Sequence, residues 1–471
     1  MADPVSITHD RFGLGARPGD DLPRDLRGYL RDQLRRYTPS PALLDDAPGL
    51  AQIGAHYQRM VDLRADARGQ DMQSEEALVA ARGMRREDHE MARQNGASRL
   101  AHAVQTATPF AERLVYFWSN HFAVSVDRMP MHSLAGDHEF RAIRPHIMGN
   151  FAELVKAAVL HPAMLAFLNQ EQSIGPQSEF GIWAAPRRGR RGVGLNENLA
   201  RELLELHTLG VRGGYTQTDV TELARALTGW TVAGFTRGAE RRFYSGEAGM
   251  AVFAEALHEP GARTILDRRY PENGQSQALS IIEDLAIHPA TARHVATKLA
   301  RHFIADDPPE PTIARLEDAF LGSGGDLPAV YSALIEEPLV WAAERNKFRS
   351  PWDWLVASLR ASDSQAIEGH RLVRLLTTLG QPLWSPGHPA GWSDRAGDWA
   401  SPGALLSRVE IANRLAVGTG RRIDGEELAS EILGDALRPS TRDALIASGR
   451  AGGTGGMGLA LLLSSPEFLR R

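Results

Sequence analysis

Apolar residues recur every three or four positions along most of this chain, which is the spacing of amphipathic helices. Leu26, Leu30 and Leu34 predict a short helix over 23–36, and Leu199, Leu203 and Leu206 predict another that begins at Asn196. Further helices are predicted over 50–105, 149–169 with a break near Pro162, and 276–345. The pattern predicts a mainly α, large multi-helical globular fold.

Two segments interrupt this periodicity. Residues 231–275 contain Gly, Phe and Tyr without helical spacing, so a small β-hairpin or extended insertion is expected there. Residues 171–194 carry two prolines and a basic run, which predicts a loop. Changes in composition predict one unit over 1–471 with three parts: an N-terminal helical arm over 1–105, a central helical core over 106–345, and a C-terminal helical subdomain over 346–471.

Charge and composition exclude several classes of protein. The 53 basic and 58 acidic residues nearly balance, which gives no electrostatic footprint for nucleic acid. No apolar run is long enough to span a membrane. The chain has no cysteine, so any metal site must use His, Asp, Glu or water. No signal peptide is recognisable at the N-terminus, so a cytoplasmic location is expected, with periplasmic location by co-export left open.

The densest group of charged residues lies on the helix that begins at Asn196. Glu197, Arg201 and Glu205 are spaced four apart and line one face, and Glu202 is three residues from Glu205. A carboxylate pair at this spacing suits a divalent cation, or acid–base chemistry if the pKa of one carboxyl is raised. The alternative is an ordinary solvated face with Glu–Arg ion pairs.

Two histidines extend this hypothesis. His121 lies in the apolar segment "FWSNHF" and His258 in the polar segment "LHEPGAR". If both converged with Glu202 and Glu205, they would form a His/carboxylate metal centre with open coordination positions. The alternatives are a hydrogen-bonded core histidine at 121 and a loop histidine at 258.

Other candidate residues are cationic or aromatic. Arg201 and Arg225 could bind an anionic group of a substrate. Trp384, Trp392 and Trp399 share one loop-rich segment, where they could stack on a sugar ring or a partner, or simply anchor a buried loop.

Lysine is rare, with only Lys156, Lys298 and Lys347 among the 53 basic residues. Arginine is the default cation of this chain, so a retained lysine can mark a site that needs a compact ammonium group. For Lys298, beside the buried stripe of its helix, we predict a structural pair with a carboxylate or backbone carbonyls.

The ordered motifs resemble the bacterial family called domain of unknown function 1800. They include "RFGLGARPGD", "FWSNHFAVS", "NENLARELLELHTLGVRGGYTQTDVTELARALTGWT", "HEPGARTIL", "FRSPWDWLVASLRA" and "LLLSSPEFLRR", and extend from about residue 8 to 471. His121, Arg201, Glu202, Glu205, Arg225 and His258 all match motif positions of that family. The chain departs from the family pattern at Glu259, more often Asp, and at Arg263, more often Lys.

The resemblance implies a fold and little biochemistry, because the family is uncharacterised. Its members are often encoded beside proteins that resemble sulfatases and alkaline phosphatases. Two functions therefore remain open. The first is a metal-dependent enzyme, with Glu202, Glu205, Arg201 and Arg225 as catalytic groups and His121, Glu202, Glu205 and His258 as ligands of a divalent metal. The second is a non-catalytic partner or maturation factor for a sulfatase/phosphatase-like neighbour.

Overall fold

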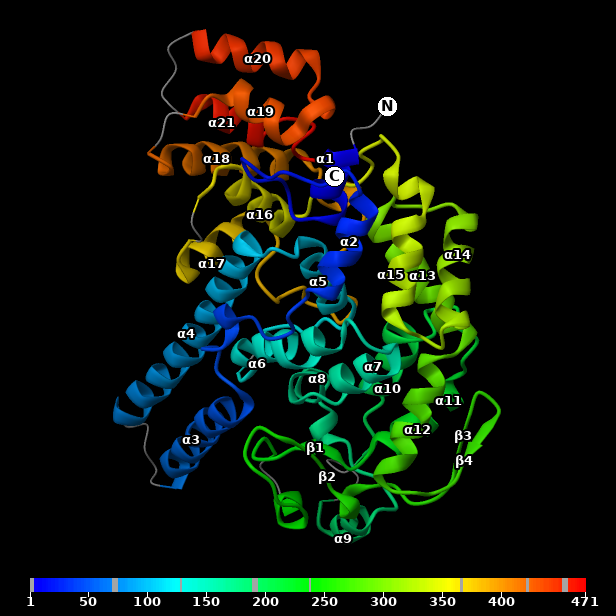
Figure 1. The fold of residues 1–471 in the computed structure, drawn as a ribbon. Coiled ribbons are helices and arrows are strands. Elements are labelled where there is room, and N and C mark those ends of the chain that lie inside the picture. The colour runs from blue at the N-terminus through cyan, green and yellow to red at the C-terminus, as the bar shows by residue number, and fades with distance from the viewer. Residues whose placement is uncertain are drawn as a thin grey trace.

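Helices dominate the described chain, as the apolar spacing predicts, and strands are confined to two short pairs (Figure 1). The structure is a computed structural model. It describes residues 4–69, 75–127, 129–188, 194–236, 239–364, 367–420, 423–450 and 456–471. Within those ranges, the helices are all too short or too polar to cross a membrane.

The N-terminal part contains two long helices that lie side by side (Figure 1). They occupy the region 50–105, where the sequence predicts one or two helices. The elements of residues 4–69 and 75–105 are α1 (Pro4–Ile7), the π-helix η1 (Thr8–Phe12), α2 (Leu26–Arg35), η2 (Ala42–Leu44), α3 (Leu50–Gly69) and α4 (Glu75–Gln105).

The central part is built around α5, which is buried along most of its length. The predicted break near Pro162 is present, because α7 ends at Val159 and α8 begins at Pro162. The elements are α5 (Pro109–His121), α6 (Met131–Asp137), the π-helix η3 (His138–Ile143), η4 (Arg144–His146), α7 (Phe151–Val159), α8 (Pro162–Phe167), η5 (Gln170–Gln172), α9 (Glu179–Arg188), α10 (Asn198–Glu202), the π-helix η6 (Leu203–His207) and α11 (Gln217–Leu227).

The predicted β-hairpin region forms two antiparallel pairs of three-residue strands. Strand β1 (Trp230–Val232) pairs with β2 (Ala251–Phe253), with Thr231 opposite Val252. Strand β3 (Arg263–Ile265) pairs with β4 (Arg268–Tyr270). Two short 3₁₀ helices, η7 (Ala239–Phe243) and η8 (Glu255–Leu257), lie between β1 and β3.

Helices make up most of the described residues after β4, and the last of them gather at the end of the molecule where α1 also lies (Figure 1). The elements are α12 (Gln275–Ala286), α13 (Pro289–Phe303), α14 (Glu310–Gly322), α15 (Leu327–Glu336), η9 (Pro338–Trp341), α16 (Pro351–Ala361), α17 (Gly369–Thr378), η10 (Ala396–Asp398), α18 (Pro402–Gly418), α19 (Gly425–Leu433), η11 (Gly434–Ala436), α20 (Pro439–Arg450) and α21 (Met457–Leu463).

One hydrophobic core connects segments that are far apart in the sequence. Phe12 packs against Phe110 of α5 and Phe303 of α13, with ring centroids 5.2 and 6.0 Å away. The same core includes Trp354 of α16 and Leu459 of α21. Burial of apolar area therefore depends on the N-terminal, central and C-terminal segments together. The three-part division of the chain stays a prediction.

The predicted loop over 171–194 is wrong in its middle, where α9 forms. Phe180 is fully buried in a small second cluster, and its ring lies 5.1 Å from that of Phe243. This packing stabilises a helix that Gly181 and Pro186 disfavour, because tertiary burial outweighs local propensity.

Candidate functional site

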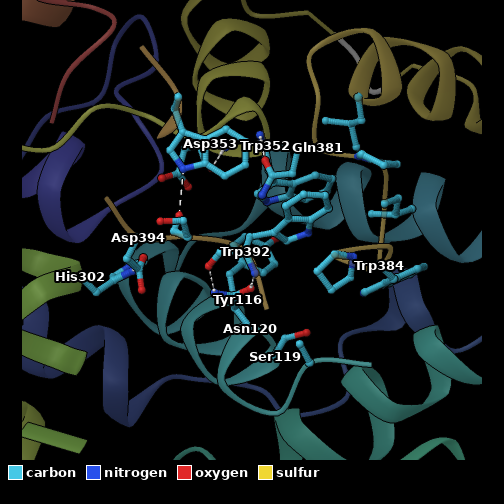
Figure 2. A pocket seen from close by; sticks show the side chains of 18 of the residues that line it. Tyr116, Ser119, Asn120, His302, Trp352, Asp353, Gln381, Trp384, Trp392 and Asp394 are labelled. Atoms are coloured by element: carbon cyan, nitrogen blue, oxygen red, sulfur yellow. Dashed lines mark hydrogen bonds and ion pairs between the residues drawn. The ribbon is translucent and has the colours of Figure 1, made fainter. Parts of the chain in front are cut away.

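A cavity of about 110 Å³ lies where α4, α5 and α16 meet the loop between α17 and α18 (Figure 2). Aromatic and charged side chains from distant parts of the sequence line it together. The main ones are Arg99, Arg113, Tyr116, Ser119, Asn120, His302, Lys347, Trp352, Asp353, Gln381, Trp384, Trp392, Asp394, Trp399 and Arg471.

Aromatic rings form one wall of the cavity. Tyr116 of α5 and Trp352 of α16 meet nearly at right angles, with ring centroids 5.5 Å apart. Trp392 and Trp399 come from the loop, and their centroids are 5.9 Å apart. Within the loop, Trp399 Nε1 donates to the carbonyl of Ser393 at 2.8 Å, and the Trp399 side chain is buried. Trp392 and Trp384 are only partly buried.

The side chain of Asn120 fixes the position of Trp392. Its Nδ2 donates to the Trp392 carbonyl at 2.8 Å, and its Oδ1 accepts from the Trp392 amide at 2.7 Å. The preceding residue, Gly391, has φ +77°, and a Cβ there would lie 2.4 Å from the Asn120 carbonyl oxygen. Only glycine fits at this contact between loop and helix.

Arg99 is held in place by a carboxylate and by aromatic rings. Its Nε donates to Glu139 Oε1 at 2.6 Å. The guanidinium carbon lies 4.3 Å from the centroid of Tyr116 and 4.1 Å from that of Trp352. The other oxygen of Glu139 accepts hydrogen bonds from Ser119 and Trp384. The π-helix η3 carries Glu139, so this irregular turn positions the residue that organises one side of the cavity.

His302 and Asp394 form a hydrogen-bonded pair on the opposite side. The 2.8 Å contact joins His302 Nδ1 to Asp394 Oδ1, and Nε2 lies 3.5 Å from Nη2 of Arg471. Burial lowers the pKa of His302 to about 4, although Asp394 opposes this shift. Burial alone would raise the pKa of Asp394, but attraction to His302 and Lys347 holds it below its usual range. The imidazole is therefore neutral at pH 7, and Asp394 fixes its tautomer.

The remaining charges of the cavity are paired. Arg113 Nη1 donates to both oxygens of Asp353 at 3.2–3.3 Å, and Arg471 Nε lies 3.3 Å from the same carboxylate. Against the effect of burial, these two arginines lower the pKa of Asp353 to about 2. Lys347 is buried and donates to Asp306 and to the Asp394 carbonyl.

The predicted charged helix is present but ends in a π-helical turn, η6. The helix begins at Asn198 with Glu197 as its N-cap, so the predicted cap at Asn196 is one residue early, although Asn196 Oδ1 accepts the amide of Asn198. Arg201 pairs with Glu197 at 3.1 Å, which the spacing predicts. Glu205 lies in the π-turn, where the extra residue changes the helical spacing, and its partner is the Tyr215 hydroxyl at 3.2 Å.

The predicted catalytic groups are only partly buried, and none of them lines the cavity. The pKa of Glu202 is raised by burial and by the nearby charge of Glu205. The Arg201 side chain is 39% exposed. Arg225 forms an ion pair with Glu222 on the same helix and is equally exposed. Catalytic roles for Glu202, Glu205, Arg201 and Arg225 stay predictions.

The two predicted histidine ligands have separate backbone partners. His121 is buried, its Nε2 lies 3.1 Å from the carbonyl of His207, and His207 Nδ1 lies 3.2 Å from the carbonyl of His121. His258 Nδ1 donates to the Thr228 carbonyl at 2.9 Å. His258 lines a different cavity, beside Glu255 and Glu272.

The predicted metal ligands are not brought together. Within the described ranges, no three His, Asp or Glu side chains are arranged to hold a metal ion, and this includes the set His121, Glu202, Glu205 and His258. The physical reason is that each of these histidines is hydrogen-bonded to the backbone of a different segment. A divalent metal therefore stays a prediction from the sequence.

The predicted structural pair of Lys298 is wrong. Its ammonium has no hydrogen bond or ion pair with any described residue, although it interacts electrostatically with Asp394. Burial lowers its pKa to about 8. Around it lie three imidazoles, those of His121, His207 and His294, whose pKa values burial and the lysine charge both lower.

Sequence reasoning missed most of the cavity. Arg99 lies in the predicted N-terminal helical arm, where no sequence pattern marks it as a site residue. His302 and Asp394 are 92 positions apart, so no local motif joins them. Two signals did point here: the three tryptophans of one loop, and the rare lysine Lys347. Each became informative only when the fold placed it beside the others.

The comparisons with known proteins identify a family. The model described as "Protein of unknown function (DUF1800)" matches residues 7–470, so the chain belongs to this family. No curated protein and no solved structure matches the chain. The family membership expected from the sequence motifs is thereby confirmed.

Proposed function

We propose that this member of the family binds a small organic ligand in the cavity lined by Arg99, Tyr116, Trp352, Trp384 and Trp392. The observation that carries the proposal is the convergence of aromatic faces and polar groups from α4, α5, α16 and the tryptophan loop on one cavity. Aromatic walls combined with fixed polar groups that orient the ligand are common in small-molecule sites.

The size of the cavity limits the ligand. A volume of about 110 Å³ holds roughly seven to ten water-sized groups. The ligand, or the part of it that enters, therefore has about that many non-hydrogen atoms. Rings such as Tyr116 and Trp392 favour a flat body, which they contact through their faces and edges.

A screen of small flat probes by thermal shift and tryptophan fluorescence tests this function. Binding to the native state raises the melting temperature, and a ligand against Trp384 or Trp392 changes their emission. The variant Ala123→Leu fills part of the cavity and is expected to abolish both signals. Ala404→Leu, at a position that does not line the cavity, is the matched control. Equal binding by both variants would place the ligand elsewhere.

A second candidate function is acid–base catalysis on the bound ligand. The observation that favours it is the Asp394–His302 pair, which supplies a neutral imidazole with a fixed tautomer at the cavity wall. His302 would accept a proton from the ligand at Nε2 after the side chain of Arg471, which lies 3.5 Å from this atom, moves aside. His302→Asn keeps a donor toward Asp394, so it should retain ligand binding and lose turnover. Unchanged turnover in this variant would remove His302 from the chemistry.

The metal-dependent enzyme remains a separate prediction, centred on Glu202, Glu205, His121 and His258. Elemental analysis of protein purified without chelators tests it directly. A metal held by these residues would be stoichiometric, would raise the melting temperature, and would be lost in Glu205→Ala. The role as partner of a sulfatase/phosphatase-like protein also stays a prediction, which co-purification with that neighbour would test.

A further inference from the structure

We infer that the ligand of this cavity carries an oxyanion, a carboxylate or a phosphate or sulfate group, and that the two terminal NH₂ groups of Arg99 bind it. The inference rests on the proposed function, because it names the chemical class of ligand for the same cavity.

The orientation of Arg99 is fixed before any ligand arrives. Its Nε donates to Glu139 Oε1 at 2.6 Å, and its guanidinium carbon lies 4.3 and 4.1 Å from the ring centroids of Tyr116 and Trp352. The residue is 9% exposed and Glu139 is 1% exposed. A guanidinium held in this way loses little side-chain entropy on binding.

The end of the Arg99 guanidinium remains unused. Among the residues that the structure describes, neither Nη1 nor Nη2 of Arg99 has a hydrogen-bond partner, and both keep contact with solvent. The other two arginines of the cavity are engaged: Arg113 with Asp353, and Arg471 with Asp353 and His302. Parallel N–H groups at one guanidinium edge match the two oxygens of a carboxylate or the oxygens of a phosphate.

Other unpaired groups around the cavity are also hydrogen-bond donors. Tyr116 Oη, Trp352 Nε1 and Nη1 of Arg471 are buried without a hydrogen-bond partner in the described part of the chain. Buried donors of this kind are normally satisfied. A ligand rich in acceptors would satisfy those that it reaches.

The acceptors of the cavity, by contrast, are largely in use. Asp353 accepts from Arg113 and lies against Arg471, and Asp394 accepts from His302. A cationic ligand would meet the charge of Arg99 without a free carboxylate to replace it. The balance of unused groups therefore favours an anion over a cation or a neutral donor.

Matched probes separate charge from shape. We would titrate the full chain with benzoate and its neutral isostere benzamide, with acetate and acetamide, and with inorganic phosphate and sulfate, by calorimetry and tryptophan fluorescence. Benzoate is expected to bind at least about tenfold more tightly than benzamide, as a lost charge-assisted hydrogen-bond pair implies. If only phosphate or sulfate binds, the oxyanion is tetrahedral and the inference holds in that form.

A charge-conserving variant tests the role of the forked geometry. Arg99→Lys should weaken anion binding about tenfold or more and leave benzamide binding unchanged, because lysine lacks the paired N–H groups. Arg268→Lys is the matched control: Arg268 also lies 5.4 Å from a tyrosine ring, pairs with Asp284, and does not line the cavity. It should bind all probes as the wild type does.

The outcomes distinguish the two proposals. Equal affinity for benzoate and benzamide in the wild type would overturn the oxyanion inference and leave the ligand site standing. Unchanged anion binding in a folded Arg99→Lys protein would do the same. Absence of binding by every probe, charged and neutral, would overturn the ligand site itself. The wild-type comparison is decisive even if the variant fails to fold.

Discussion

The charged face of α10 and the aromatic cavity differ in how far apart their partners lie in the sequence. Glu197, at the N-cap of α10, pairs with Arg201 four residues away, and Glu205 of η6 accepts from Tyr215 ten residues away. In the cavity, Glu139 binds Arg99 from 40 residues away, and Asp394 binds His302 from 92 residues away. The local face is the one that a sequence pattern reveals.

Burial also separates the two regions, and it decides what their charges can do. The Glu139 side chain is 1% exposed, whereas those of Glu197 and Arg201 are 32% and 39% exposed. An exposed ion pair contributes little to stability, because water screens it and two long side chains lose freedom. A buried carboxylate such as that of Glu139 is stable only when its oxygens accept hydrogen bonds. The donors that supply these bonds are thereby held in one geometry. A dense charge pattern is therefore weaker evidence for a site than a few buried charges.

The sharpest contrast is expected on removing one carboxylate from each region. Glu139→Ala leaves Arg99 buried without its carboxylate partner and frees Ser119 and Trp384, so the free energy of unfolding should fall by about 3–5 kcal/mol. Glu205→Ala removes one hydrogen bond at a partly exposed site and should cost no more than about 1 kcal/mol. Urea unfolding of both variants measures the difference. Similar losses would show that burial does not separate the energetics of the two carboxylates.

The next effect concerns the contact that seats Trp392. Gly391→Ala places a Cβ 2.4 Å from the Asn120 carbonyl oxygen at φ +77°, and should lower the free energy of unfolding by about 1–3 kcal/mol. Gly397→Ala, in the same loop with no atom within 4 Å of its Cβ, is the control and should be nearly neutral. Tryptophan emission should shift in the first variant only. An unshifted spectrum would show that the loop adapts without moving its rings.

Acid should weaken the protein through buried histidines such as His302. Its pKa is about 4 in the folded state against 6.5 for the free side chain. Between these values the unfolded state binds the extra proton, so stability falls as pH decreases from 6.5 toward 4, on the order of 1 kcal/mol per pH unit. His138 and His207, with pKa values of about 3, act in the same direction. Melting temperatures of wild type and His302→Asn over this range should converge at low pH; parallel curves would exclude a contribution from His302.

The smallest change in stability is expected for Glu202 of α10, whose pH dependence has the opposite sign to that of His302. Burial and Glu205 raise the folded pKa of Glu202, so the folded state binds more protons than the unfolded state above pH 4.5. Glu202 therefore reduces stability as pH rises through that range. Glu202→Gln should raise the free energy of unfolding at pH 7 by at most about 0.5 kcal/mol, because the site is partly solvated. A clear loss of stability would reveal a cation held by the carboxylate, as the metal hypothesis requires.

Local rules explain much of the fold that was predicted. The Thr216–Asp219 capping box begins α11, where Val220, Leu223 and Leu227 recur at helical spacing and are fully buried. Pro162 and Gly210 mark helix boundaries because proline and positive φ exclude a continued helix. Local rules do not predict three features: the helix α9, the π-turn at 203–207, and the surroundings of Lys298, which has no hydrogen bond or ion pair with a described residue. All three involve segments that are far away in the chain.

The sequence by itself determined the helical class, the family, the short strands near 231–275 and the capping of individual helices, because these depend on periodicity and on contacts within a few residues. Only the tertiary structure decided which charges meet. Arg99, Glu139, His302 and Asp394 have no common spacing, and their pairing follows from how α4, η3, α13 and the tryptophan loop pack. Buried charges are stable only where partners from other segments complete their hydrogen bonds, and no local pattern records those partners.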